Sequence, residues 1–230
     1  MLLAPLHKVI EKFYTFRFYL LLITLLIYFF ITPLIFHPLI KIIFRLVTST
    51  GLMLAGANFI QRDKIVLRTA WFILGVLIIG MIAFANLVHE NVEIESTQYI
   101  LLFLFFAGIT INLLQQIFSI KEVTADVIVG SFCGYILIGV ISFFLLVLID
   151  FSVPNSFSGL NTDFTTRTSD LFYFAFTCLT TLGFGDILPA NVISKNLSVF
   201  TAAVGQFYIA IVVAILVSRF MQIRSDIKPD

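Results

Sequence analysis

Charged residues are scarce in this sequence. Asp, Glu, Lys and Arg make up 12% of its 230 residues, whereas 60% are hydrophobic, and the mean hydropathy is +1.08. A soluble domain needs a polar surface, so this composition excludes an ordinary soluble protein and indicates a membrane protein. The net charge of +1 supplies no basic surface, so we expect no nucleic-acid partner.

Cysteine and histidine are also rare, with two and three residues. Cys133 and Cys178 both stand in apolar surroundings, which favours two buried thiols without a disulfide. No cluster has the spacing of a metal site, and no nucleophile–base set emerges. We therefore expect no resident metal, no cofactor and no enzyme activity. The first apolar run, which starts near Phe18, is too long for the core of a cleaved signal peptide.

Long apolar runs are abundant. A helix needs about 20 apolar residues to cross the hydrocarbon core. Six runs meet this length: Phe18–Phe36, Leu39–Ile60, Thr69–Val88, Ser96–Ile120, Val127–Ile149 and Asn196–Ser218. A seventh run, Ser169–Thr181, is too short to cross and is typical of a re-entrant helix. The expected fold class is an all-α membrane protein with six transmembrane helices and one re-entrant helix followed by a loop.

The distribution of Lys and Arg orients these spans. If both termini are cytoplasmic, ten basic residues lie inside and four outside. The inner residues are Lys8, Lys12, Arg17, Arg62, Lys64, Arg68, Lys121, Arg219, Arg224 and Lys228. The outer residues are Lys41, Arg45, Arg167 and Lys195. This excess satisfies the positive-inside rule and predicts a multi-pass protein of the plasma (inner) membrane with cytoplasmic termini.

Lys41 and Arg45 lie four residues apart on one face of the second span. Two alternatives stay open for them. Their side chains extend to the outer headgroups, or they pair with the acidic outer turn, whose carboxylates are Glu90, Glu93 and Glu95.

Residues 177–190, TCLTTLGFGDILPA, separate the short helix from the last span. Gly183 and Gly185 permit backbone angles that other residues avoid, and their alternation lets successive carbonyls turn to one side. Four such strands around an axis would form rings of carbonyl oxygens that replace the hydration shell of a potassium ion. Thr168 or Ser169 can cap the short helix.

Asp170 then lies in the first turn of that helix, where a negative charge is favourable. The opposite end carries a partial negative charge. If this end points toward the membrane centre, it favours a cation there.

The stretch DLFYFAFTCLTTLGFGDILP resembles the pore helix and selectivity filter of the potassium channel superfamily, whose usual core is Thr-Val-Gly-Tyr-Gly-Asp. The later stretch GQFYIAIVVAILVSRF is similar to the inner helix of small bacterial channels with a two-helix pore. The resemblance covers about residues 124–221. It implies a homotetramer in the lipid bilayer that conducts potassium passively, with K⁺ as the permeant ion and not a cofactor.

The resemblance also implies roles for single residues. The potassium-binding filter would consist of Thr181, Leu182, Gly183, Phe184 and Gly185, with K⁺ bound at the first four. Filter support would come from Thr180, Asp186, Tyr173, Phe174 and Thr177. Gly205 lies twenty residues after Gly185, where the superfamily has the hinge of the inner helix. A glycine that packs against the pore helix is an equally supported reading.

Two filter residues depart from the commonest pattern. Leu182 replaces valine, and Phe184 replaces tyrosine and lacks its hydroxyl. Tyr173 and Phe174 stand where many relatives have tryptophans, and Thr177 where one subgroup has a buried glutamate. We expect a filter that is held more by ring packing than by hydrogen bonds, and that collapses more easily.

The expected domains are a four-span bundle at 1–122, a pore domain at 123–221 and a short cytoplasmic tail at 222–230. The bundle resembles a voltage-sensor domain, but its fourth span, STQYILLFLFFAGITINLLQQIFSI, has no arginine. Voltage sensors carry arginines every third residue there, so we expect weak or absent voltage gating. Neither end of the sequence is long enough for a soluble ligand-binding domain.

Two further function classes remain at this point. A non-selective cation channel has the same architecture, because the residues around a filter affect its selectivity. An ion transporter or accessory subunit would use the loop as a half-helix substrate site, but it would more often show a second broken helix.

Overall fold

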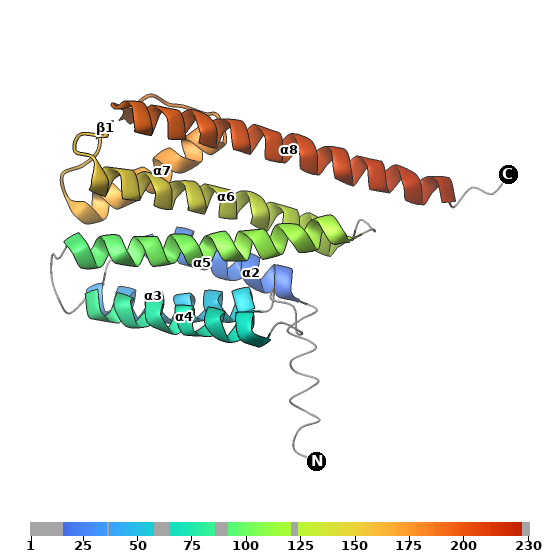
Figure 1. The fold of residues 1–230 in the computed structure, drawn as a ribbon, viewed down its shortest axis with the longest axis horizontal. Helices are drawn as coiled ribbons and strands as arrows, with labels where there is room; N and C mark the ends of the chain where they lie inside the picture. The colour runs from blue at the N-terminus through green and yellow to red at the C-terminus, as the bar shows by residue number, and fades with distance from the viewer. Residues whose placement is uncertain (1–15, 36, 58–64, 86–91, 121–123, 227–230) are drawn as a thin grey trace, which may run out of the picture.

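The computed structural model describes residues 16–35, 37–57, 65–85, 92–120 and 124–226, and this part of the chain is almost entirely helical (Figure 1). In chain order the elements are α2 (Arg17–Leu26), the π-helical turn η1 (Ile27–Ile31), the 3₁₀ turn η2 (Thr32–Leu34), α3 (Pro38–Ala57), α4 (Ile65–Ala85), α5 (Val92–Ser119), α6 (Ala125–Ser152), β1 (Phe157–Ser158), α7 (Phe164–Leu179), β2 (Leu188–Pro189) and α8 (Val192–Asp226).

The long helices lie roughly side by side in layers (Figure 1). Helices α3 and α4 form one edge, α5 and α2 lie across the middle, and α6 and α8 form the opposite edge. The short helix α7 packs between α6 and α8 at one end. Both α2 and α5 pack directly on α6 of the same chain. The four-helix bundle is therefore joined to the helices around the 177–190 loop within one protomer.

Helix α6 is the centre of the packing. In α6, 61% of the apolar stretch is buried. Neighbouring helices approach it closely at its glycines. Gly130 faces the ring of Phe18 from α2, and Gly134 faces the hydroxyl of Tyr208 from α8. Aromatic rings also pack beside α6. Phe29 of η1 stacks on Phe172 of α7 with ring centroids 5.3 Å apart. This ring contact ties the start of the bundle to α7.

Three described helices are long and apolar enough to cross a membrane: Glu95–Ser119, Ala125–Ser152 and Val192–Arg219. Shorter apolar helices cover Arg17–Ile31, Leu46–Gly56 and Trp71–Met81. The chain is thus an all-α membrane protein, as expected. That the shorter helices also cross remains a prediction, as does the division into domains at residues 122 and 221.

Several predicted boundaries are wrong by a few residues. The apolar span in α8 is Val192–Arg219, so it begins four residues before the predicted span Asn196–Ser218 and ends one residue after it, while the helix itself continues to Asp226. The first span stays helical to Leu34 by changing from α to π to 3₁₀ geometry near Pro33. The side chains of Lys41, Arg45, Glu90 and Glu93 lie outside the described part of the chain, so their predicted pairing is untested.

A two-stranded antiparallel sheet was not expected from the sequence. Phe157 pairs with Pro189, and Ser158 pairs with Leu188. Each strand has only two residues, which is too short for an alternating pattern to appear. The sheet fastens the segment after α6 to the segment that follows residues 181–186.

Candidate functional site

The N-terminal end of α7 is capped by Asp163. Its carboxylate accepts hydrogen bonds from the Thr166 amide at 3.0 Å and the Thr166 hydroxyl at 2.9 Å. The expectation that the helix begins at Ser169 and is capped by Thr168 or Ser169 is therefore wrong. Its first turn is polar, so the apolar run alone does not mark the true start. An Asp three residues before a Thr was the capping signal available.

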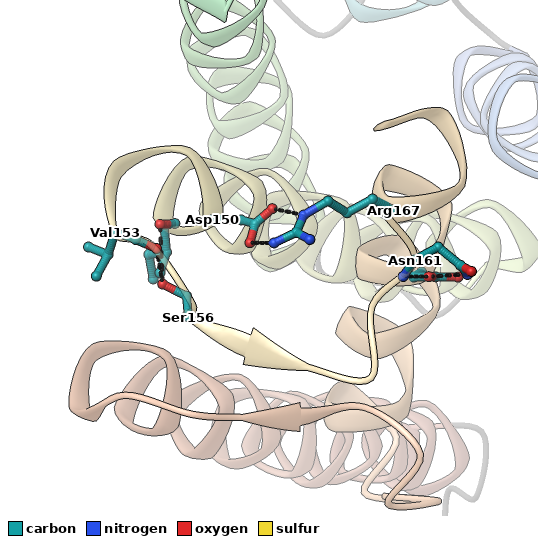
Figure 2. A network of polar contacts seen from close by, with 7 residues as sticks. Asp150, Val153, Ser156, Asn161 and Arg167 are labelled. Atoms are coloured by element: carbon teal, nitrogen blue, oxygen red, sulfur yellow. Dashed lines mark hydrogen bonds and ion pairs between the residues drawn. The ribbon is translucent and has the colours of Figure 1, made fainter. Parts of the chain in front are cut away.

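Asp170 consequently does not lie in the first turn of α7. Its carboxylate accepts hydrogen bonds from the backbone amide of Asn161 at 3.0 Å and from the Asn161 side chain at 2.7 Å (Figure 2). It therefore fastens the loop before the helix to the helix's second turn.

An ion pair holds the same end of α7 to α6. The Arg167 guanidinium donates from Nε to Asp150 at 2.5 Å and from Nη2 at 2.6 Å (Figure 2). The two side chains are 30% and 12% exposed. The hydrogen bond to Asp150 raises the pKa of Arg167 above its usual value, so the guanidinium stays charged. We call Asp150 and Arg167 the outer ion pair.

Ser156 makes several hydrogen bonds in the loop that follows α6. It is fully buried, and its hydroxyl donates to the Val153 carbonyl at 2.6 Å (Figure 2). Its carbonyl accepts from the Ala190 amide and the Ser194 hydroxyl, both at 2.8 Å. The Asn191 side chain donates to the Ser156 hydroxyl at 2.8 Å. These bonds fix the start of α8 relative to the end of α6.

The C-terminal end of α7 turns directly into residues 181–185. The Thr177 carbonyl accepts from the Leu182 amide at 2.9 Å and from the Gly183 amide at 3.3 Å. The Thr177 hydroxyl donates back to Phe174, and the Thr180 hydroxyl to Phe176. The Thr177 carbonyl therefore holds the first turn of the loop, and Thr180 closes the last turn of α7. Their role as filter support remains a prediction.

The backbone of residues 181–185 alternates between positive and negative φ. Thr181, Gly183 and Gly185 have φ values of +58°, +52° and +82°, whereas Leu182 and Phe184 are not in the left-handed region. Alternation of this kind turns successive N–H groups to one side and successive carbonyls to the other. The glycines adopt these angles freely, but Thr181 is β-branched and strained there. The described backbone therefore has the alternating φ pattern that a row of carbonyls beyond the end of α7 requires.

Tyr173 supports the outer part of this loop. Its ring stacks on Phe184 with centroids 6.2 Å apart and planes at 6°. Its hydroxyl faces the side chain of Asp186, whose carboxylate accepts from the Ile187 amide at 3.0 Å. Phe174 instead packs edge-on against Phe157 of β1. The ring packing expected of both residues is therefore present, and Tyr173 also has a carboxylate beside its hydroxyl.

Gly205 lies where α8 crosses the last turn of α7. It is buried, and a Cβ built on it would collide with the Leu179 carbonyl oxygen. Helix α8 continues unbroken through this residue. The next residue, Gln206, donates from Nε2 to the Thr181 hydroxyl at 3.3 Å. The close contact gives the packing role a physical basis.

Several residues of the site were not singled out from the sequence. The outer ion pair joins residues 17 apart, and Gln206 reaches Thr181 across 25 residues, so no local pattern marks either contact. Of the residues that were missed, Asp163 has a recognisable sequence signal, because an Asp three residues before a Thr is typical of a helix cap.

Comparison with known proteins agrees with this geometry. Residues 130–222 match the family model described as an ion channel, which is of the two-helix type. This range begins in α6 and includes α7, residues 181–185 and nearly all of α8. Comparison with curated proteins and with solved structures gave no significant match. Residues 130–222 are therefore an ion channel domain, as expected of a member of the potassium channel superfamily.

Proposed function

We propose that this protein is a potassium-selective channel that conducts passively through the backbone of Thr181–Gly185. The observation that carries the proposal is the left-handed backbone at Thr181, Gly183 and Gly185, directly after the C-terminal end of α7. Uncharged carbonyls in a row substitute for the hydration shell of a monovalent cation. The partial negative charge at the end of α7 adds to the attraction of a cation at this depth.

One chain supplies one strand of such a filter, so the proposal requires four chains. The exposed surface of a single protomer supports this. Only 11% of the apolar stretch of α8 is buried, against 61% of α6. Leu182 and Phe184 are also 62% and 67% exposed. These surfaces would be covered by neighbouring subunits in a homotetramer, with the strands meeting at the central axis.

The proposed orientation places the outer ion pair and β1–β2 outside, and both termini in the cytoplasm of a plasma-membrane protein. Residue 17 and residue 219 both contact the C-terminal end of α5, so the first and last described helices reach the same end of the molecule. The excess of Lys and Arg predicted for that side supports a cytoplasmic location.

The proposal is tested by recording from the purified protein in a planar bilayer with potassium on one side and sodium on the other. A reversal potential close to the potassium equilibrium value supports it. A reversal near zero would leave a non-selective cation channel, and slow saturating flux without unitary currents would indicate a transporter. Gly185→Ala is the matched variant, which tests whether the backbone at this residue determines selectivity. Its Cβ meets nothing within 4 Å, but its φ of +82° disfavours any L side chain, so selectivity should be lost while the protein still folds.

A further inference from the structure

The C-terminal end of α5 binds a side chain from α8. The last carbonyls of a helix have no partner within the helix, and they carry its partial negative charge. Arg219 donates from Nη1 to the Ile117 carbonyl at 3.3 Å and from Nη2 to the Phe118 carbonyl at 3.0 Å. No basic residue of α5 itself lies in its last turn. The guanidinium of Arg219 therefore satisfies both carbonyls and neutralises the helix end.

A second cation reaches the same end of α5 by a different route. Arg17 of α2 donates from Nε to the side chain of Gln116 at 3.0 Å, and its guanidinium lies 4.7 Å from the centre of the Phe18 ring. These contacts of Arg17 join α2 to α5. The two arginines can therefore be compared, because both reach the same end of α5, Arg17 from α2 and Arg219 from α8.

Arg219 holds a part of α8 that is largely exposed, although Leu216 packs against the core. Ile211, Val213 and Val217 are at least half exposed. Between residues 209 and 219, which the structure describes throughout, Arg219 is the residue whose side chain hydrogen-bonds to another helix. Farther back along α8, the Tyr208 hydroxyl donates to the Ser131 carbonyl of α6 at 2.6 Å. The segment after Tyr208 is therefore held at its far end by Arg219.

The direction of this contact determines its effect. Helix α6 lies between α8 and α5 (Figure 1). Because Arg219 donates to two carbonyls of α5, its side chain is directed toward the bundle. In the tetramer of the proposed function, on which this inference rests, the exposed face looks toward the other subunits and the axis. We infer that Arg219 is a positioning residue for conduction. It holds the cytoplasmic end of α8 outward on α5 and so keeps the inner mouth of the pathway wide.

Single-channel recording tests this inference with Arg219→Gln, Arg219→Lys and Arg17→Gln. Loss of a charge-assisted pair of hydrogen bonds should lower the open-to-closed ratio about tenfold in Arg219→Gln. The lysine variant keeps the charge at the helix end and should recover part of the ratio. Arg17→Gln should leave the ratio within about twofold, because the hydrogen bond it removes joins α2 to α5. Unitary conductance and reversal potential should be unchanged in all three. An unchanged or higher open probability in Arg219→Gln overturns the inference.

A structural readout separates this inference from the channel proposal. Nitroxide labels at Met221→Cys, in a Cys178→Ser background, report distances between the ends of α8 in the purified oligomer by pulsed electron paramagnetic resonance. Met221 is 61% exposed, whereas Cys133 is fully buried and should not be labelled. The distances should shorten when Arg219→Gln is added and not when Arg17→Gln is added. Unchanged distances overturn the inference even if currents are potassium-selective. If wild-type protein shows no unitary current, the channel proposal fails, and the distances still decide whether Arg219 holds α8 outward.

Discussion

The guanidinium of Arg167 and the carboxylate of Asp150 face each other with two hydrogen bonds, of 2.5 Å and 2.6 Å, across 17 residues of sequence. This ion pair links the end of α6 to the first turns of α7. It therefore sets the position of the short helix that leads into residues 181–185.

Asp150→Asn is expected to destabilise the protein. It leaves a half-buried arginine without its charged partner, which costs about 1–2 kcal/mol. Arg167→Gln should cost a similar amount, and the double variant should be no less stable than the worse single variant. Thermal unfolding midpoints of the four proteins in detergent measure this coupling. Strictly additive losses would show that the pair contributes no interaction energy.

Asp163→Ala should weaken the start of α7. The variant removes the cap that satisfies the Thr166 amide, and loss of such a cap costs about 1 kcal/mol. Ser169→Ala is the matched control, because Ser169 lies within the helix and is exposed. Its unfolding midpoint should stay within error of the wild type. The opposite ranking of the two variants would place the helix start at Ser169.

Gly205→Ala should be damaging although alanine favours helices. Its Cβ would collide with the Leu179 carbonyl, and backbone cannot give way as a side chain does, so we expect a loss of about 1–3 kcal/mol. Gly80→Ala in α4 is the control, because a Cβ there meets nothing within 4 Å. It should be neutral or stabilising by up to about 1 kcal/mol. A Gly205→Ala protein with wild-type stability would favour the hinge reading over packing.

Two substitutions at Tyr173 separate ring packing from hydrogen bonding as support for residues 181–186. Tyr173→Phe keeps the stack on Phe184 and removes the hydroxyl that faces Asp186, whereas Tyr173→Leu removes both. If packing dominates, as the sequence suggests, only the leucine variant should lose current faster during a sustained opening, by roughly tenfold or less. Macroscopic current decay at several external potassium concentrations measures the effect. Equal acceleration in both variants would assign the support to Asp186.

Voltage should have little effect on open probability. Moving one elementary charge through the field is worth about 2.3 kcal/mol per 100 mV, and Val92–Ser119 has no basic residue to move. The slope of open probability against voltage should correspond to less than about one charge per channel. A slope of several charges would require gating charges elsewhere in the chain.

The sequence predicts the helices well and their contacts poorly, for a physical reason. Apolar length decides where a helix can lie in lipid, so the runs at 96–120 and 127–149 coincide with α5 and α6 to within a few residues. The start of α7 is different, because its first turn, from Phe164 onward, is polar and depends on one cap at Asp163. Hydropathy does not detect such a turn.

The candidate site likewise has some features that the local sequence predicts and others that it does not. The alternation of Gly183 and Gly185 is local and visible in the sequence, whereas a left-handed Thr181 is not, since threonine rarely adopts that backbone. Contacts between distant segments are also invisible. Arg219 meets Ile117 across 102 residues, and nothing in the local pattern of either one indicates the other.

The exposed face of α8 also bears on biosynthesis. Its apolar side chains, such as Val199 and Phe207, are compatible with lipid before any partner arrives, so a newly inserted chain can complete its bundle alone and meet other chains by diffusion in the membrane. Each proposed tetramer would then assemble at random from the chains that the cell is synthesising. A cell expressing equal amounts of intact chain and a chain defective at Gly185 would assemble all-intact tetramers only about one time in sixteen. Such a defect would be dominant.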